Sequence, residues 1–114
     1  MNNFLKNDIV LVKYPFSDLT TFKVRPAIVI NEKYPSNDII IVPLTSRITI
    51  QLPGEFTLSK WKESGLHILS SVKRGIFTID EKLVVQKIGV LQFEDIKKLR
   101  TSVKSWMGFA DEKI

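Results

Sequence analysis

The sequence predicts a small, mainly β domain with one C-terminal helix. Short apolar runs broken by turn residues recur along most of the chain, a pattern typical of a small barrel or sandwich. Only the last segment changes period, with apolar residues at steps of three and four. No internal repeat, low-complexity tract or linker divides the 114 residues, so we expect a single domain over residues 1–114.

Six strands are expected from the apolar runs. The first is closed by Pro15, and the loop that follows, 15–23, is long for a hairpin, which is typical of a functional loop. The third run is apolar on both faces, so we expect it at the centre of the sheet, and the fourth at an edge. The expected strands are Ile9–Tyr14, Ala27–Ile30, Ile39–Leu44, Glu55–Leu58, Ser71–Phe77 and Leu83–Ile88.

Two helical segments are expected. Residues 59–65 predict one or two turns, with Ser59 as the N-cap and Gly65 ending them in the left-handed conformation. The C-terminal helix carries acidic residues in its first turn, where the helix dipole favours them. Its apolar stripe should pack on the barrel or on a second copy of the chain. The stripe consists of Phe93, Ile96, Leu99, Val103, Trp106 and Met107.

Composition limits the classes of function. The absence of cysteine excludes disulfides, thiolate metal sites and cysteine nucleophiles. His67 is the only histidine, so one chain cannot use a two-histidine mechanism, and the acidic residues indicate no metal or cofactor site. Neither a signal peptide nor a membrane span is indicated, so the cytoplasm is the expected compartment. A net charge of +5 favours nucleic acid as a partner, although basic surfaces also serve solubility.

Polar residues stand at one end of two neighbouring β-branched runs. Lys23 and Arg25 precede the second strand, and Thr45, Ser46 and Arg47 follow the third. In antiparallel neighbours the start of one strand lies beside the end of the other, so these side chains should meet at one rim of the sheet. A guanidinium with nearby hydroxyls suits a phosphate diester, because arginine offers a fixed fork of donors.

An ordered series of motifs makes the sequence similar to the MazF/PemK (Kid) family of toxin endoribonucleases. The resemblance runs through nearly the whole chain, and the order and spacing of the motifs carry it rather than any one of them. The motifs are Asp8–Val12, Tyr14–Leu19, Lys23–Val29, Val42–Ser46, Leu58–Leu66, Ile76–Asp80 and Val84–Gly89.

That resemblance implies an SH3-like β-barrel with a C-terminal helix, working as a homodimer. Family members cut single-stranded RNA, often mRNA at a short recognition sequence, without a metal. Cleavage leaves a 2′,3′-cyclic phosphate and a 5′-hydroxyl. A cognate antitoxin neutralises the toxin with an acidic, flexible tail that wraps the active-site groove.

The resemblance also assigns roles to individual residues. It places the family's essential arginine at Arg25 and its essential hydroxyl at Thr45, with Ser46 adjacent, while Lys23 and Arg47 are expected to contact RNA phosphates. Arg25 would hold the charge that builds on the phosphate oxygens when the ribose 2′-hydroxyl attacks, and Thr45 would donate a further hydrogen bond.

The proton acceptor is left open by the sequence. Relatives carry an acidic residue near the strand that here begins at Ser71, but this chain has Lys73 and Arg74 there, which can stabilise charge or bind a flanking phosphate. Asp18 is the remaining carboxylate near Arg25, and it can equally bond its own backbone in a turn. Phe22 can stack on an unpaired base or fold back onto the protein.

Two rival functions remain open at this stage. One is an RNA- or protein-binding barrel that has lost cleavage, which the missing acidic residue near Lys73 favours. The other is a toxin of the same barrel type that poisons DNA gyrase through its C-terminal helix.

Overall fold

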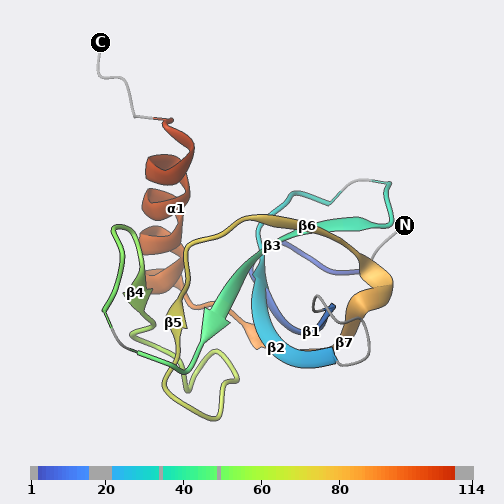
Figure 1. Ribbon diagram of the computed structural model, residues 1–114, viewed down its shortest axis with the longest axis horizontal. Coiled ribbons are helices and arrows are strands. Elements are labelled where there is room, and N and C mark those ends of the chain that lie inside the picture. The colour runs from blue at the N-terminus through green and yellow to red at the C-terminus, as the bar shows by residue number, and fades with distance from the viewer. Residues whose placement is uncertain (1–2, 16–21, 34, 49, 110–114) are drawn as a thin grey trace.

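The computed structural model describes residues 3–15, 22–33, 35–48 and 50–109, and in them the chain forms a curled antiparallel sheet and one C-terminal α-helix (Figure 1). The elements are β1 (Asp8–Pro15), β2 (Phe22–Val29), β3 (Asp38–Thr45), β4 (Phe56–Thr57), β5 (Ser71–Val72), β6 (Phe77–Asp80), the short 3₁₀ turn η1 (Glu81–Leu83), β7 (Val84–Val90) and α1 (Phe93–Met107). The mainly β class with a C-terminal helix is therefore confirmed.

β3 is the centre of the sheet, as its sequence predicts. The strand order is β4-β5-β3-β2-β1-β7, and β6 adds a third neighbour to β3. β4 pairs only with β5 and lies at the predicted edge. Within the described ranges no pairing joins β4 to β7, so the path does not close on itself.

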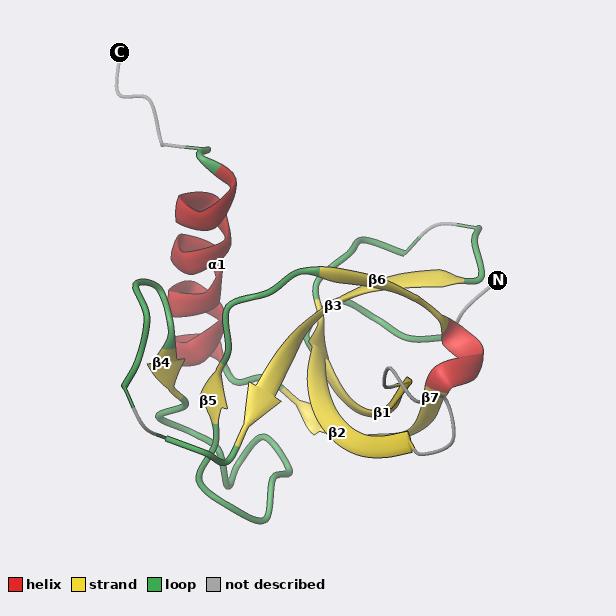
Figure 2. Cartoon of the chain, in the orientation of Figure 1, coloured by secondary structure: helices red, strands yellow, loops and turns green. Residues whose placement is uncertain are grey.

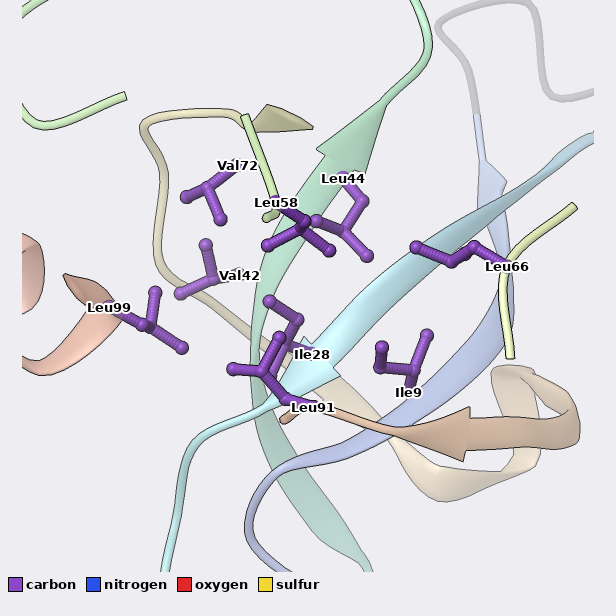
Figure 3. Close-up of a cluster of buried hydrophobic side chains, with 9 residues drawn as sticks. All are labelled: Ile9, Ile28, Val42, Leu44, Leu58, Leu66, Val72, Leu91 and Leu99. Carbon is purple, nitrogen blue, oxygen red and sulfur yellow. The ribbon is translucent and has the colours of Figure 1, made fainter. Parts of the chain in front are cut away.

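Alternation along the strands divides the buried apolar residues into two clusters. On β2, Ile28 faces one cluster while Ala27 and Val29 face the other, which explains why these strands are apolar on both faces. The helix-side cluster, shown in Figure 3, is Ile9, Ile28, Val42, Leu44, Leu58, Leu66, Val72, Leu91 and Leu99. The second cluster is Val10, Val12, Ala27, Val29, Ile39 and Ile41.

The helix α1 packs on the barrel through the middle of its predicted stripe. Leu99 is buried in the helix-side cluster. Three further residues of the helix are partly buried and pack against this cluster: Ile96, Val103 and Trp106. The ends of the stripe do not pack on the sheet within one chain, since Phe93 is 69% and Met107 50% exposed; the predicted alternative, packing on a second copy, stays a prediction. Trp61 and Trp106 both pack against this cluster. No helix in the described part of the chain is long and apolar enough to cross a membrane.

The segment predicted as one or two helical turns, residues 59–65, forms hydrogen-bonded turns and not a regular helix. Its helical contact is the N–H of Ser64, which donates to the carbonyl of Lys60 at 3.0 Å. Figure 2 shows the segment between β4 and β5 without a helix. Ser59 does not cap a helix start; its backbone N–H instead donates to the buried carboxylate of Asp95 on α1. A tertiary acceptor therefore organises this turn. Gly65 does adopt the expected left-handed conformation, with φ of 100°, and lies against the backbone of Ile88.

The strand predicted over Ser71–Phe77 is divided into β5 and β6. Both pair with β3, but at different ends: Val72 lies opposite Leu44, whereas Phe77 lies opposite Ile41. The chain must bend between β5 and β6 because both strands pair with different parts of β3. This bend carries Lys73 and Arg74, and it places them beside the end of β3.

Candidate active site

A cavity of about 400 Å³ lies where β2 begins and β3 ends. Ala27 pairs with Pro43, and two residues further out in each strand the same face carries Arg25 and Thr45. These residues follow the second cluster outward along its own face, so the cavity is a polar extension of that core. Its lining consists of Tyr14, Arg25, Pro43, Leu44, Thr45, Arg47, Lys73, Arg74 and Phe77.

The cavity is strongly cationic. Three arginines and Lys73 line it, and no carboxylate or imidazole does so among the described residues. Arg25 is half-buried in β2, opposite Val12 of β1, whereas the other three cations are exposed. A site with this charge attracts an anion, and Arg25 is the cation that the sheet holds most firmly.

Thr45 shapes the turn that leaves β3. Its hydroxyl oxygen accepts a hydrogen bond from the backbone N–H of Arg47, with an N···O distance of 3.0 Å. This local bond turns the chain so that Arg47 lines the cavity. Ser46 is exposed and does not line the cavity.

Lys73 and Arg74 are held by their backbone rather than by their side chains. The N–H of Lys73 donates to the carbonyl of Pro43 at 2.9 Å, and the N–H of Arg74 donates to the Glu55 carboxylate at 2.8 Å. The other oxygen of that carboxylate accepts from Leu52 N–H at 2.7 Å. Glu55 thus ties the 50–55 loop to the bend behind the cavity, a role that its position in the sequence does not reveal.

The remaining predicted residues lie outside the cavity or outside the described structure. Lys23 is exposed on β2, opposite Tyr14, and does not line the cavity. The backbone of Phe22 begins β2, but its side chain lies outside the described residues. Asp18 also lies outside them.

Tyr14 is a cavity residue that the sequence analysis missed. Its hydroxyl oxygen is buried and has no hydrogen-bond partner in the described structure. Burial raises the pKa of Tyr14 above 10.0, and the nearby Arg25 guanidinium opposes this shift. The sequence does contain a pattern that indicates this position: Val10, Val12 and Tyr14 alternate along β1, so they share one face beside β2.

A second cavity of about 280 Å³ adjoins the first and shares Thr45, Arg47 and Lys73 with it. Exposed apolar side chains line its other side, and the most prominent is Ile50, which is 90% exposed. The exposed apolar members are Ile48, Ile50 and Leu52, and the buried Val72 forms part of the wall. Three apolar residues alternating over 48–52 were the sequence signal for this surface.

The described residues contain no group of three side chains suited to hold a metal ion.

The family model for the PemK-like, MazF-like toxin of type II toxin–antitoxin systems matches residues 6–107. The chain belongs to this family. The resemblance inferred from the ordered motifs is thereby confirmed, and the toxin shares its fold with solved structures of the same type.

Three solved structures illustrate the likeness of this PemK/MazF-family chain to known toxins. An endoribonuclease in complex with its cognate antitoxin, from a mycobacterial species, is 13% identical, with a TM-score of 0.78 over 95% of this chain and 98% of that chain. The toxin MazF-mt6 of Mycobacterium tuberculosis is 18% identical, with a TM-score of 0.74 over 91% and 99%. A chain of the MazE–MazF complex of Deinococcus radiodurans is 16% identical, with a TM-score of 0.77 over 96% and 100%.

These matches confirm the predicted MazF-like barrel fold with its C-terminal helix. No curated protein sequence matches the chain.

Proposed function

We propose that this toxin is a sequence-specific, metal-independent endoribonuclease of single-stranded RNA. The reaction is attack of the ribose 2′-hydroxyl on the adjacent phosphorus, which gives a 2′,3′-cyclic phosphate and a 5′-hydroxyl end. The observation that carries the proposal is the shared cavity of Arg25 and Thr45, lined by three further cations and by no described carboxylate. The endoribonucleases among the structural neighbours support it.

The chemistry assigned to the cavity is stabilisation of charge. Negative charge builds on the non-bridging phosphate oxygens as the 2′-oxygen attacks. Arg25 binds these oxygens with its planar fork of donors, and the Thr45 hydroxyl donates one more hydrogen bond. Because β2 and β3 hold both residues, the donors are in place before the reaction and need little rearrangement during it.

Flanking nucleotides extend along the same surface. Arg47, Lys73 and Arg74 contact neighbouring phosphates, which strengthens binding without selecting a sequence. The adjoining apolar cavity receives an unpaired base, and selection of the cleavage sequence takes place there. Lys23 remains a candidate for a contact with RNA outside the main cavity, and Phe22 and Asp18 remain candidates for contacts with RNA. Ser46, next to Thr45, remains a candidate catalytic residue.

Two protein partners complete the proposal: a second copy of the chain and a cognate antitoxin. The antitoxin complexes among the structural neighbours support the antitoxin as a partner, and an acidic antitoxin segment would complement the cationic cavity. The toxin acts in the cytoplasm, where mRNA is available. Light scattering at micromolar concentration should give about twice the 13.1 kDa of one chain; a mass of one chain contradicts the homodimer.

The decisive experiment incubates purified toxin with a long unstructured RNA in the presence of EDTA and maps new 5′-hydroxyl ends. Discrete cuts by the native chain, absent with Arg25→Ala and with Thr45→Ala, support the proposal. Intact RNA that is nevertheless bound by folded protein would favour a binding module. Intact RNA together with inhibited DNA supercoiling would favour a gyrase poison.

A further inference from the structure

Tyr14 carries a polar group that has no partner among the residues that the structure describes. Its hydroxyl oxygen is buried, yet no hydrogen bond reaches it in the described structure. Leaving a buried hydroxyl unpaired costs free energy, so a group of this kind calls for a hydrogen-bond partner. The unpaired hydroxyl belongs to a residue that lines the cationic cavity.

The position of Tyr14 follows from β1. The side chain packs against the second cluster, on the same face as Val10 and Val12. Val12 lies opposite Arg25, so Tyr14 is the next residue outward on that face and the diagonal neighbour of Arg25. The effect of the Arg25 charge on Tyr14 agrees with this closeness. Tyr14 therefore reaches the cavity from a third strand, beside the two that carry Arg25 and Thr45.

We propose that the Tyr14 hydroxyl donates a hydrogen bond to a phosphate oxygen of the RNA bound in this cavity, beside Arg25. This inference rests on the endoribonuclease function proposed above and adds a third donor to the site. Because the hydroxyl is buried, this contact requires side chains at the cavity wall to move when the phosphate enters; Arg47 and Lys73, which line the cavity with Tyr14, are exposed. The bound phosphate then supplies an acceptor that the described residues do not provide.

The protonation state of Tyr14 suits a donor. Burial raises the pKa of the phenol and outweighs the opposing effect of Arg25, so the hydroxyl keeps its proton at neutral pH. A phenol that keeps its proton can donate to an anion, but it cannot serve as the base that accepts the 2′-hydroxyl proton. Tyr14 is therefore assigned to charge stabilisation, together with Arg25 and Thr45.

The test is Tyr14→Phe, which removes only the hydroxyl. We expect RNA cleavage to slow on the order of 10- to 100-fold, as for loss of a hydrogen bond to a charged group. Thermal stability should be unchanged or higher, because the variant removes an unpaired buried group. Thr78→Val is the control, since it removes an exposed hydroxyl from β6 outside the cavity, and it should cleave at the native rate.

Three outcomes overturn the inference. Cleavage by Tyr14→Phe at the native rate would do so while leaving the proposed endoribonuclease intact. A clear loss of stability in Tyr14→Phe would do so because it would reveal a partner inside the fold. If the native chain does not cleave RNA, the proposed function fails, and titration with inorganic phosphate then tests the Tyr14 contact. Weaker phosphate binding by Tyr14→Phe than by the native chain supports the contact, and equal binding overturns it.

Discussion

The buried carboxylate of Asp95 accepts a hydrogen bond from the backbone N–H of Ser59, with an N···O distance of 2.9 Å. Its second oxygen accepts from the N–H of Lys60, also at 2.9 Å. The first turn of α1 is thereby tied to the loop that follows β4. The Ser59 hydroxyl in turn accepts from Lys98 on the same helix, at 2.8 Å.

Replacing Asp95 by alanine should destabilise the fold by about 3–6 kcal/mol, because it removes two hydrogen bonds to a buried carboxylate and each bond to a charged group contributes about 1.5–3 kcal/mol. Urea unfolding followed by circular dichroism measures this change. Glu94→Ala is the matched control, since Glu94 is exposed in the same turn and should cost less than about 1 kcal/mol. Equal losses in the two variants would contradict the role of Asp95.

Arg25→Ala should slow RNA cleavage on the order of a hundredfold or more, because it removes the half-buried cation of the cavity. Arg25→Lys should restore part of the rate, since it keeps the charge but loses the planar fork. Single-turnover cleavage of a defined RNA measures both variants. Arg100→Ala on α1 removes an exposed arginine outside the cavity and should cleave like the native chain.

The hydroxyl of Thr45 can be separated from its methyl group by two substitutions. Thr45→Ser keeps the hydroxyl and its bond to Arg47 N–H, so cleavage should stay within about threefold of native if one hydrogen bond accounts for the effect. Thr45→Val keeps the shape and should lose on the order of a hundredfold. The same single-turnover assay applies. Loss of activity in Thr45→Ser equal to that in Thr45→Val would mean that the methyl group matters instead.

Gly89 sits where β7 meets the 59–65 turn. A Cβ added there would overlap the carbonyl oxygen of Ser64, a backbone atom that accepts a hydrogen bond from Val90. Gly89→Ala should therefore lower the free energy of unfolding by about 1–3 kcal/mol or more, as overpacking does. Gly108→Ala, with φ of 75° and open space around it, should cost only about 1 kcal/mol. Thermal unfolding compares the two, and a milder effect at Gly89 would contradict the close approach.

Stability should fall with rising pH through Tyr14. The pKa of Tyr14 is raised in the folded chain, so the unfolded chain loses its phenol proton first, and the folded state loses stability as pH rises above about 10. Below that pH the phenol is neutral in both states, so it does not make the free energy of unfolding depend on pH. Tyr14→Phe should show a shallower decline between pH 9 and 11 in urea unfolding. Parallel pH curves for the two proteins would contradict the shift.

Sequence periodicity predicted most elements because the causes are local. The short apolar runs of β1 to β3, the apolar stripe of α1 and the left-handed Gly65 all depend on neighbours within a few residues. The same local pattern predicted that Arg25 and Thr45 would lie at one rim, since antiparallel neighbours bring the start of one strand to the end of the next. Residues 59–65 form turns but not a regular helix, because the distant carboxylate of Asp95 binds the backbone at the start of the segment.

By itself, the sequence determined the mainly β class, the C-terminal helix, the family, and the pair Arg25 and Thr45. Only the tertiary structure decided what surrounds that pair. The bend between β5 and β6 brings in Lys73 and Arg74, Glu55 fastens that bend, and β1 adds Tyr14. These placements depend on contacts between segments far apart in the chain. Local periodicity does not encode such contacts, because they arise from how one central strand, β3, shares its length among three neighbours.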